Sequence, residues 1–568
     1  MPQSDAPARS DAQGEETGHP RRWWILAILV VSLLVVVIDN TILNVALKTL
    51  ADPHDGLGAS QSELAWMVNS YTLVFAGLLF AFGVVGDRLG RKVMIMAGLV
   101  VFGVASLLSA YADSPLQLIL FRSIMGMGAA MMMPSTLSML RAVFPAKEFP
   151  KALAVWTAAV GASGALGPLV GGALLERFWW GSVFLVNVPI VVFGLLFIGI
   201  LAPESRGRQG KPDVVGMLLS VAGLVTLTYG IIEAGESGTW NNVEAWGTMA
   251  VGGLILVWFI WWEAITPHAS LDVSLFKKQL FSVSAFTMTL VFFISMGLMF
   301  FMSFYLQIVR GYSPMQAGLL FLPTAISMLL FAPGSNNLVQ KLGPKTVGIG
   351  GMLLLIGSVL VVTRLEADTP IVMIVVAFSL QGVGMAYLMP PAMTTLMNAM
   401  PSDQAGVGSA LSNTLRQVGG ALGVAVLSTV MAQDYRRSLT EEIPVIRGEA
   451  RESVASTYAA LDSVDGIPPP VRMFVLEAAD RSFISAMHVT AYTACAIAVV
   501  GLIVVALFYP RRERQDVPQQ RRAETPDYRA KMENLEWGPP LPPLGESEQE
   551  HGELQTAGQA PRRHRQGQ

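Results

Sequence analysis

The stretches GMGAAMMMP (residues 126–134) and GVGMAYLMP (residues 382–390) are two copies of one pattern, and they decide the fold. Two further segments repeat at nearly the same separation. The loop Asp87–Lys92 has a weaker echo at Gln340–Lys345, and Gly164-Ala-Leu-Gly167 is similar to Gly420-Ala-Leu-Gly423. The chain therefore contains two similar halves in the same order. Parallel halves around a central site are typical of proteins that work by alternating access.

The sequence around these copies is long and apolar. Of the 568 residues, 52% are hydrophobic and 14% are charged, whereas soluble domains carry about 25% charged residues. Crossing a membrane takes about 20 apolar residues in a helix. Fourteen such stretches occur, at residues 23–47, 63–85, 93–112, 115–140, 152–175, 182–202, 214–233, 245–264, 281–307, 314–334, 346–363, 370–397, 406–431 and 485–509. We therefore predict an all-α polytopic membrane protein with fourteen transmembrane helices.

The repeat assigns these helices to units. Residues 23–202 form an N-terminal six-helix half, 203–264 a linker with two inserted helices, and 265–510 a C-terminal six-helix half. Residues 1–22 and 511–568 are polar and are expected to be disordered tails. Lysine and arginine gather in the short loops on one side of the predicted membrane, which places both termini in the cytoplasm.

A long loop at about 433–484 is expected outside the membrane on the opposite side. Within it, residues 449–461 can form a short helix, and the proline run at 467–470 is expected to break it. Either a passive cap or an extracellular gate fits this loop.

Ionisable residues within apolar stretches are candidates for function because they are unfavourable in lipid. Asp39 lies inside the first predicted helix, Arg122 one turn before the glycines of the fourth, and Arg416 in the thirteenth. Burial favours the neutral form of an acid and a nearby arginine favours its ionised form, so Asp39 is a candidate proton carrier. The alternative is a structural role, in which Asp39 hydrogen-bonds to Asn40 or Thr41.

The tight turn between the second and third helices carries a second candidate site. Its residues Gly83, Asp87, Arg88, Gly90, Arg91 and Lys92 combine glycines, an acid and three cations. An acid here can meet a helix N-terminus of the opposite half and latch one conformation. A plain basic cytoplasmic loop would explain the cations, but not the acid and the glycines together.

Other patterns are less specific. Met385, Met389, Met393 and Met397 form a stripe on one predicted helix, and Phe300 and Phe304 share the same spacing on another. Such side chains suit a wall for varied lipophilic ligands, although core packing is the simpler interpretation. The sequence contains no phosphate loop, no His-Glu-x-x-His and a single cysteine. We therefore expect no metal, no cofactor, no enzyme activity and an ion gradient as the energy source.

These motifs together resemble the major facilitator superfamily, in particular its 14-span drug:proton antiporters. Residues 83–92, Arg122 with its glycines, and the run 161–172 are similar to that family's signatures. So are residues 39–46 and 184–189. The resemblance implies the major facilitator fold and proton coupling through Asp39 and Arg122. It assigns a conformational latch to the 83–92 motif and antiport gating to Gly161, Gly164, Gly167, Pro168 and Gly171.

By this resemblance the protein exports amphipathic drugs or toxic compounds across the cell membrane in exchange for protons. Residues expected to form the substrate wall are Asn69, Tyr71, Phe300, Phe304, Met389, Asn413 and Arg416. Some relatives carry further membrane acids where this chain has Asn69, Met328, Ser412 and Asn413, which argues against dications. The expected partners are small amphipathic molecules, protons and membrane lipid, without nucleic acid, and a monomer is compatible. The alternatives are export of one endogenous metabolite, antibiotic or lipid, and a non-transporting membrane receptor on the same fold.

Overall fold

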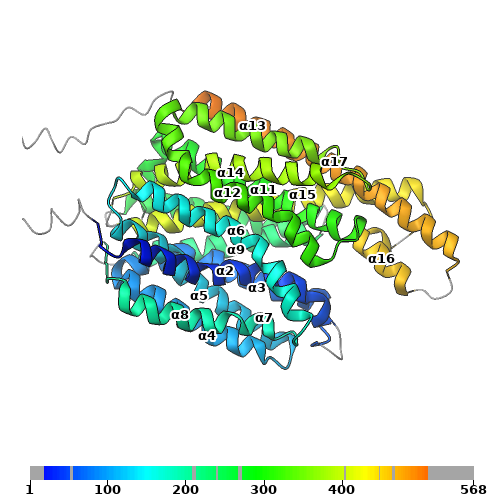
Figure 1. Ribbon diagram of the computed structural model, residues 1–568, viewed down its shortest axis with the longest axis horizontal. Helices are drawn as coiled ribbons and strands as arrows, with labels where there is room; N and C mark the ends of the chain where they lie inside the picture. The colour runs from blue at the N-terminus through cyan, green and yellow to red at the C-terminus, as the bar shows by residue number, and fades with distance from the viewer. Residues whose placement is uncertain are drawn as a thin grey trace, which may run out of the picture. The chain divides into compact units, whose positions relative to one another are not determined.

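Long α-helices build the part of the chain that the computed structural model describes, namely residues 18–51, 56–59, 61–207, 213–237, 241–266, 271–401, 404–446, 448–463 and 467–509. Within that part there is no strand. In chain order (Figure 1) the helices are α2 (Arg22–Ala51), α3 (Gln61–Leu89), α4 (Arg91–Ala110), α5 (Pro115–Val143), α6 (Phe149–Leu175), α7 (Ser182–Leu185), α8 (Asn187–Leu201), α9 (Val214–Ser237), α10 (Val243–Ile265), η1 (Val273–Lys277), α11 (Gln279–Phe304), η2 (Tyr305–Val309), α12 (Pro314–Leu342), α13 (Pro344–Val362), α14 (Ile371–Ala399), α15 (Ala405–Glu442), η4 (Gly448–Arg451), α16 (Val454–Ser463) and α17 (Pro469–Phe508). Apart from residues 18–22, both predicted tails lie outside the described residues.

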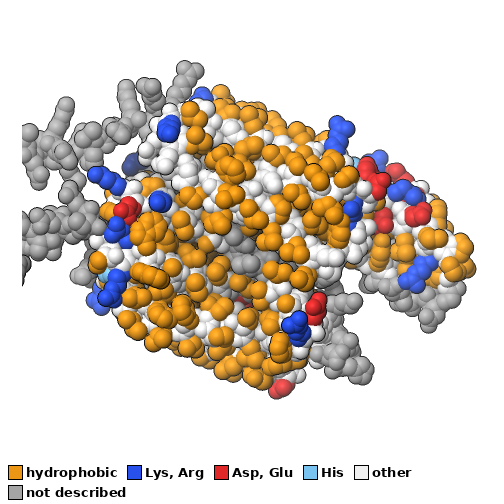
Figure 2. Space-filling view, in the orientation of Figure 1, with side chains coloured by type: hydrophobic (Ala, Val, Ile, Leu, Met, Phe, Trp, Pro, Cys, Tyr) orange, Lys and Arg blue, Asp and Glu red, His pale blue; other side chains and the backbone are white. Residues whose placement is uncertain are grey.

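The predicted spans correspond to these helices. Thirteen spans in the described part are long and apolar enough to cross a membrane, and the 27-residue α6 occupies the remaining predicted position. Large apolar side chains such as Leu254 and Leu330, at 70% and 69% exposure, face outward. Figure 2 shows hydrophobic side chains over the middle of one face and charged ones gathered toward its two ends. This surface suits a hydrocarbon environment, and the predicted all-α polytopic membrane protein is confirmed.

The glycines of the repeated pattern hold equivalent helix contacts in each copy. A Cβ on Gly128 of α5 would lie 2.7 Å from the backbone N of Phe102 on α4. In the second copy, a Cβ on Gly384 of α14 would lie 3.0 Å from the carbonyl O of Gly351 on α13. Gly126 and Gly382 make the same kind of contact with α3 and α12. Each motif therefore needs glycine at both positions because two neighbouring backbones approach it.

Contacts between segments distant in sequence define where a central site can lie. Helices α3 and α5 pack against α15, and α6 packs against α12 and α14. The inserted helix α9 contacts both α3 and α15, while α10 packs against α9. The interface between the first and the last six spans is thus built mainly from α3, α5, α6, α12, α14 and α15.

The predicted long loop is shorter than expected because two helices continue beyond the apolar sequence. α15 has 38 residues and α17 has 40, so at about 1.5 Å per residue each is roughly 60 Å long. A hydrocarbon core is only about 30 Å thick. The expected short helix is present as α16, which ends at Ser463, before the proline run. The same run also begins the next helix. Pro468 caps α17 and Pro469 begins it, because the first turn of a helix needs no N–H donors.

The polar ends of α15 and α17, together with η4 and α16, form a projecting arm (residues 433–484). In Figure 1 α16 lies beside the end of α17. Tyr435 on α15 hydrogen-bonds to Thr457 on α16 at 2.7 Å between their hydroxyl oxygens. Arg481 on α17 pairs with Glu442 on α15 at 2.5 Å. Polar contacts therefore stabilise helix where a hydropathy pattern indicates a loop.

Candidate functional site

A buried ion pair joins the first and fourth predicted spans. Asp39 on α2 and Arg122 on α5 are both fully buried, and the Arg122 Nη1 donates a hydrogen bond to the Asp39 carboxylate. The Arg122 Nε also donates to the carbonyl O of Met67 at 3.2 Å. Asn40 and Thr41, the alternative partners of Asp39, have side chains outside the described residues. The structure thus gives Asp39 a cationic partner that is distant in sequence.

Asn187 donates a hydrogen bond to the other oxygen of the Asp39 carboxylate. The sequence analysis assigned this residue no role. Its Nδ2 donates to Asp39 Oδ1 at 3.1 Å and contacts Ser106 Oγ at 3.0 Å. Asn187 is the first residue of α8 because the helical span is interrupted there. Pro189 lacks an N–H and clashes with the carbonyl four residues earlier, so α7 ends at Leu185. A polar side chain in an otherwise apolar stretch was the available signal.

Tyr71, which is predicted in the substrate wall, lies against this ion pair. It is fully buried on α3, and the Arg122 guanidinium lies 4.5 Å from the centre of its ring. Its hydroxyl donates to the carbonyl O of Val36 at 3.4 Å. The ring thus stabilises the arginine through a cation–π contact, and its place in the substrate wall stays a prediction.

The protonation state of Asp39 controls the charge of this cluster. With Asp39 ionised, the two charges neutralise each other. When Asp39 takes up a proton, Arg122 is left buried without a counter-charge, and its Nη2 already has no partner among the described side chains. Removing one member of a buried ion pair is destabilising by about 3–5 kcal/mol. The free-energy change on protonation of Asp39 is therefore large enough to change which helix arrangement is preferred.

The second candidate site brings the two halves together through Asp87. Its Oδ1 accepts hydrogen bonds from Arg91 Nη2 at 2.9 Å and Nε at 3.1 Å. Its Oδ2 accepts from the backbone N–H of Gly406 at 2.7 Å and of Val407 at 3.3 Å. These two amides lie in the first turn of α15, where N–H groups have no partners inside the helix. The carboxylate thus joins α3 to the N-terminus of a helix from the other half.

Glycine allows this contact to form. A Cβ on Gly83 would lie 2.5 Å from the Ala410 Cβ and 2.8 Å from the Gly406 carbonyl O. Gly90 has φ +124°, a conformation that favours glycine. Arg88 is half-buried, and Lys92 Nζ donates to the carbonyl O of Gly199 at 2.7 Å. Gly83, Asp87 and Arg91 thus take part in the contact between the halves, whereas Gly90 and Lys92 lie against Glu204 and Gly199 of their own half.

A further contact closes the same end of the bundle. Arg141, at the end of α5, donates through Nη1 to the carbonyl O of Met397 and through Nη2 to that of Met400 at 3.4 Å. Glu204, which the sequence analysis missed, accepts from the backbone N–H of Lys92 at 3.2 Å and so caps α4. Arg141 and Asp87 together connect α3 and α5 with the end of α14 and the start of α15, so the described conformation is closed at this end.

The glycine face of α6 is described only in part. Gly167 and Gly171 are buried, while Gly161, Gly164 and Pro168 lie outside the residues whose side chains are described. α6 packs against α2 in its own half and against α12 and α14 in the other. α6 thus lies where the two halves would move relative to each other. Its role in gating stays a prediction.

The predicted substrate wall divides into separate environments. Met389 is buried with the rest of the methionine stripe, Met385, Met393 and Met397, as core packing would require. Phe300 and Phe304 are half-buried and stack edge to face at 5.2 Å between ring centres. Asn69 is half-buried on α3. Asn413 and Arg416 lie on one face of α15 and are 1% and 6% exposed.

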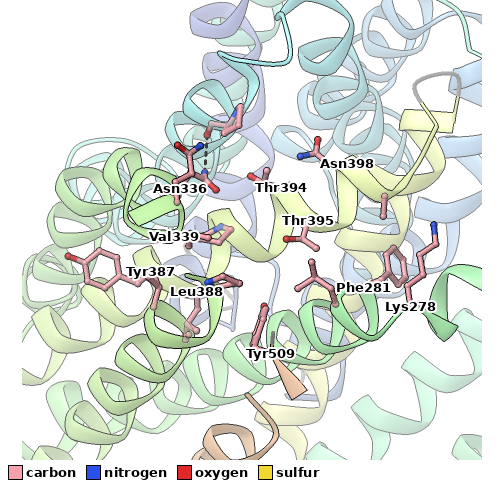
Figure 3. A pocket seen from close by; sticks show the side chains of 18 residues that line it. Lys278, Phe281, Asn336, Val339, Tyr387, Leu388, Thr394, Thr395, Asn398 and Tyr509 are labelled. Atoms are coloured by element: carbon pink, nitrogen blue, oxygen red, sulfur yellow. Dashed lines mark hydrogen bonds between the residues drawn. The ribbon is translucent and has the colours of Figure 1, made fainter. Parts of the chain in front are cut away.

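A cavity of about 370 Å³ lies elsewhere, among the ends of α11, α12, α13 and α14 (Figure 3). Lys278, Tyr387, Thr394 and Tyr509 contribute to its lining. Asn336, also in the lining, donates through Nδ2 to the carbonyl O of Pro150 at 3.4 Å. The residues of the predicted substrate wall do not line this cavity.

Comparisons with known proteins agree with this architecture. A family model of the Major Facilitator Superfamily matches residues 29–424. The chain is 32% identical over 501 residues to the multidrug efflux pump LfrA of Mycolicibacterium smegmatis, covering 87% of this chain and 98% of that protein. It is 31% identical over 515 residues to the tetracenomycin C resistance and export protein of Streptomyces glaucescens, covering 89% and 94%.

Two further matches extend the comparison. The methyl viologen resistance protein SmvA of Salmonella typhimurium (strain LT2) is 32% identical over 471 residues, covering 82% of this chain and 93% of that protein. The crystal structure of the human organic anion transporter MFSD10 (TETRAN) superposes with a TM-score of 0.58 at 13% identity, covering 86% of this chain and all of that one. At this identity the superposition shows the fold alone.

Proposed function

Because this chain belongs to the major facilitator superfamily, a family of transporters, we propose that it is a proton-coupled exporter of drug-like, amphipathic molecules. Its relatives at about this similarity are multidrug efflux and drug resistance proteins. The observation that carries the coupling is the fully buried Asp39–Arg122 pair inside the membrane. Intramembrane acids of this kind mark proton pathways.

The proposed cycle alternates two charge states with two helix arrangements. Protonation of Asp39 removes the counter-charge of Arg122, which disturbs α2, α5 and, through Asn187, α8. Opening the other end requires release of Asp87 from the N-terminus of α15. An ion gradient supplies the energy, worth about 2.3 kcal/mol per charge per 100 mV. We propose that neither a metal nor an organic cofactor takes part.

We propose the cell membrane as the location, with both termini in the cytoplasm, as the distribution of Lys and Arg in the loops favours. The ligands are small amphipathic molecules and protons. An exporter of one endogenous metabolite, antibiotic or lipid would use the same fold and the same coupling pair. In a non-transporting receptor, the Asp39–Arg122 pair and the Asp87 latch would have no function.

Reconstitution tests this proposal. Purified protein in vesicles with an internal pH dye receives a pH gradient and, in turn, a cationic, a neutral and an anionic aromatic probe. We expect uptake or release of at least one probe to move protons, and Asp39→Asn to abolish that coupling. Glu263→Gln is the matched control, because Glu263 is another buried acid, on α10 and outside the ion pair.

Three outcomes distinguish the proposed exporter from its alternatives. Coupled movement that is lost only in Asp39→Asn supports the proton-coupled exporter. Full coupling in that variant refutes the role of Asp39. No movement of any probe by correctly folded wild-type protein favours a single endogenous substrate, which competition by unrelated compounds separates from multidrug export, or a receptor.

A further inference from the structure

Arg416 is a buried cation at the interface between the two halves. It lies eleven residues into α15, or roughly 16 Å from the start of the helix, and is 6% exposed. Its guanidinium carbon is 5.7 Å from the ring centre of Trp156 on α6 and 5.0 Å from that of Phe292 on α11. One aromatic ring comes from each half, so the site is complete only when both halves are present.

Arg416 lacks the counter-charge that other buried arginines of this chain have. Arg122 pairs with Asp39, and Arg91 pairs with Asp87. Among the described residues, no carboxylate pairs with Arg416 and no hydrogen bond satisfies its Nε. A cation inside a membrane protein ordinarily pairs with an acid or a carbonyl group, so the missing partner requires an explanation.

The adjacent Trp156 lacks the same kind of partner. Its side chain is fully buried, and its Nε1 makes no hydrogen bond to any described residue. Neither a tryptophan Nε1 nor an arginine Nε can accept a hydrogen bond, since both are obligate donors. What is missing at both atoms is therefore an acceptor, which neither a quaternary ammonium group nor a purely apolar group supplies.

The face of α15 that carries Arg416 holds two more unmatched polar atoms. Ser409, Asn413 and Arg416 have the i, i+4, i+7 spacing of one helix face. Ser409 Oγ and Asn413 Oδ1 are buried without a partner in the part of the chain that the structure describes, although Asn413 Nδ2 donates to the Ser409 carbonyl O at 2.9 Å. This face of α15 therefore carries hydrogen-bond donors beside the Arg416 cation, together with the side-chain carbonyl oxygen of Asn413. The rings of Trp156 and Phe292 flank Arg416.

We propose that Arg416 and Trp156 form a subsite for the anionic group of a lipophilic aromatic substrate, such as a carboxylate, sulfonate or phenolate. This inference rests on the proposed function and specifies its substrate class. The anion accepts from Arg416 and from Trp156, and its ring system packs against the aromatic side chains. With Asp39 paired to Arg122, the bound anion neutralises the remaining positive charge.

Stacking of Arg416 on two rings is the structural alternative, because a cation is attracted to an aromatic face. Stacking does not supply an acceptor for the Nε of Arg416, however, or for the Nε1 of Trp156. It also predicts no preference between ligands of opposite charge. Ligand charge therefore separates the two interpretations.

The test uses two probes that share one ring system, pyrene-1-sulfonate and (pyren-1-ylmethyl)trimethylammonium. Binding of each to the purified full-length chain in detergent is measured by fluorescence, without any gradient. We expect the wild type to bind the sulfonate about tenfold tighter than the ammonium, since charge-assisted hydrogen bonds form only with the anion. Arg416→Gln should weaken sulfonate binding about tenfold and leave ammonium binding unchanged or tighter.

Two conservative variants complete the design. Arg416→Lys keeps the charge and should retain most of the preference, while Trp156→Phe keeps a ring and removes one donor, which should weaken only the sulfonate. If Arg416→Gln does not fold, as judged by size-exclusion chromatography, the sulfonate affinities of Arg416→Lys and Trp156→Phe test the proposal. Wild-type protein that binds both probes equally, or variants that leave sulfonate affinity unchanged, would overturn the inference.

The failure of this inference is distinguishable from failure of the proposed function. Binding of the sulfonate through Arg416 without transport of any probe refutes export but supports the subsite. Proton-coupled transport of the ammonium probe by protein that does not bind the sulfonate supports export and overturns the subsite.

Discussion

Replacing Asp87 by asparagine should open the closed end of the bundle. Asp87 accepts from two amides at the start of α15 and from Arg91. The Arg91 contacts lie within one half and survive opening, so their loss affects both conformations alike. Only the contacts with Gly406 and Val407 are specific to the closed state.

The size of the effect follows from those two contacts. A hydrogen bond to a charged group contributes about 1.5–3 kcal/mol, and a carboxylate at a helix N-terminus adds about 0.3–1 kcal/mol. Asparagine keeps one acceptor oxygen but loses the charge. We therefore expect the closed state to lose about 2–3 kcal/mol, which lowers the closed-to-open ratio roughly 30- to 150-fold, since 1.4 kcal/mol is a factor of ten.

Cysteine alkylation measures this change. Cys495 is the one cysteine in the sequence, so Cys495→Ser gives a background without thiols. Val407→Cys places a thiol at a position only 4% exposed. In Asp87→Asn, maleimide should modify this thiol at least tenfold faster, because alkylation follows the population of the open state.

The control is Asp113→Asn, which changes an exposed acid outside the latch. It should leave the alkylation rate unaltered. An alkylation rate in Asp87→Asn within twofold of the parent would refute the reasoning that this carboxylate holds the halves closed.

Three more predictions concern stability and the arm. Gly128→Ala should lower stability by about 1–3 kcal/mol, because its Cβ would meet backbone atoms of α4; Gly247→Ala, with open space around it, should not change the melting temperature in detergent. The hydrogen bond from Arg22 holds the pKa of Glu148 below its usual value. That pair therefore stabilises the fold above about pH 4.5, the usual glutamate pKa, and the contribution is lost as pH falls through the lowered value. Melting curves of Glu148→Gln should accordingly be less sensitive to acid. Tyr435→Phe removes a hydroxyl that holds α16, so limited proteolysis of the arm should become faster while the remaining helices stay resistant.

Much of the fold could be predicted because membrane spans leave a strong pattern in the sequence. Apolar stretches placed the helices, and the paired glycines of residues 126–134 and 382–390 marked equivalent contacts in two halves. The ends of α15 and α17 could not be placed in this way, because they are stabilised by tertiary contacts within the arm, such as the burial of Leu439 and the hydrogen bond of Tyr435 to Thr457. Such contacts leave no continuous apolar stretch in the sequence.

The candidate site was predictable to the extent that its residues are unusual in lipid. Asp39, Arg122 and Arg416 stand out as charges in apolar stretches, whereas their neighbours are set by tertiary packing. Nothing in the spacing along the chain connects Asn187 with Asp39. The contact of Tyr71 with Arg122 could not be predicted either, because it depends on how α3 and α5 meet.

The projecting arm offers a binding site for an antibody fragment that would help to determine further structures of this protein. Small membrane proteins without soluble domains are difficult to align in cryo-electron micrographs, because the detergent micelle hides their features. The arm holds ordered helix outside the apolar bundle, tied by contacts such as Tyr458 to Asp480 at 2.9 Å. An antibody fragment selected against α16 would add a rigid mass there. Since α15 runs from the Asp87 contact to the arm, such a fragment would also reveal how far this helix moves between conformations.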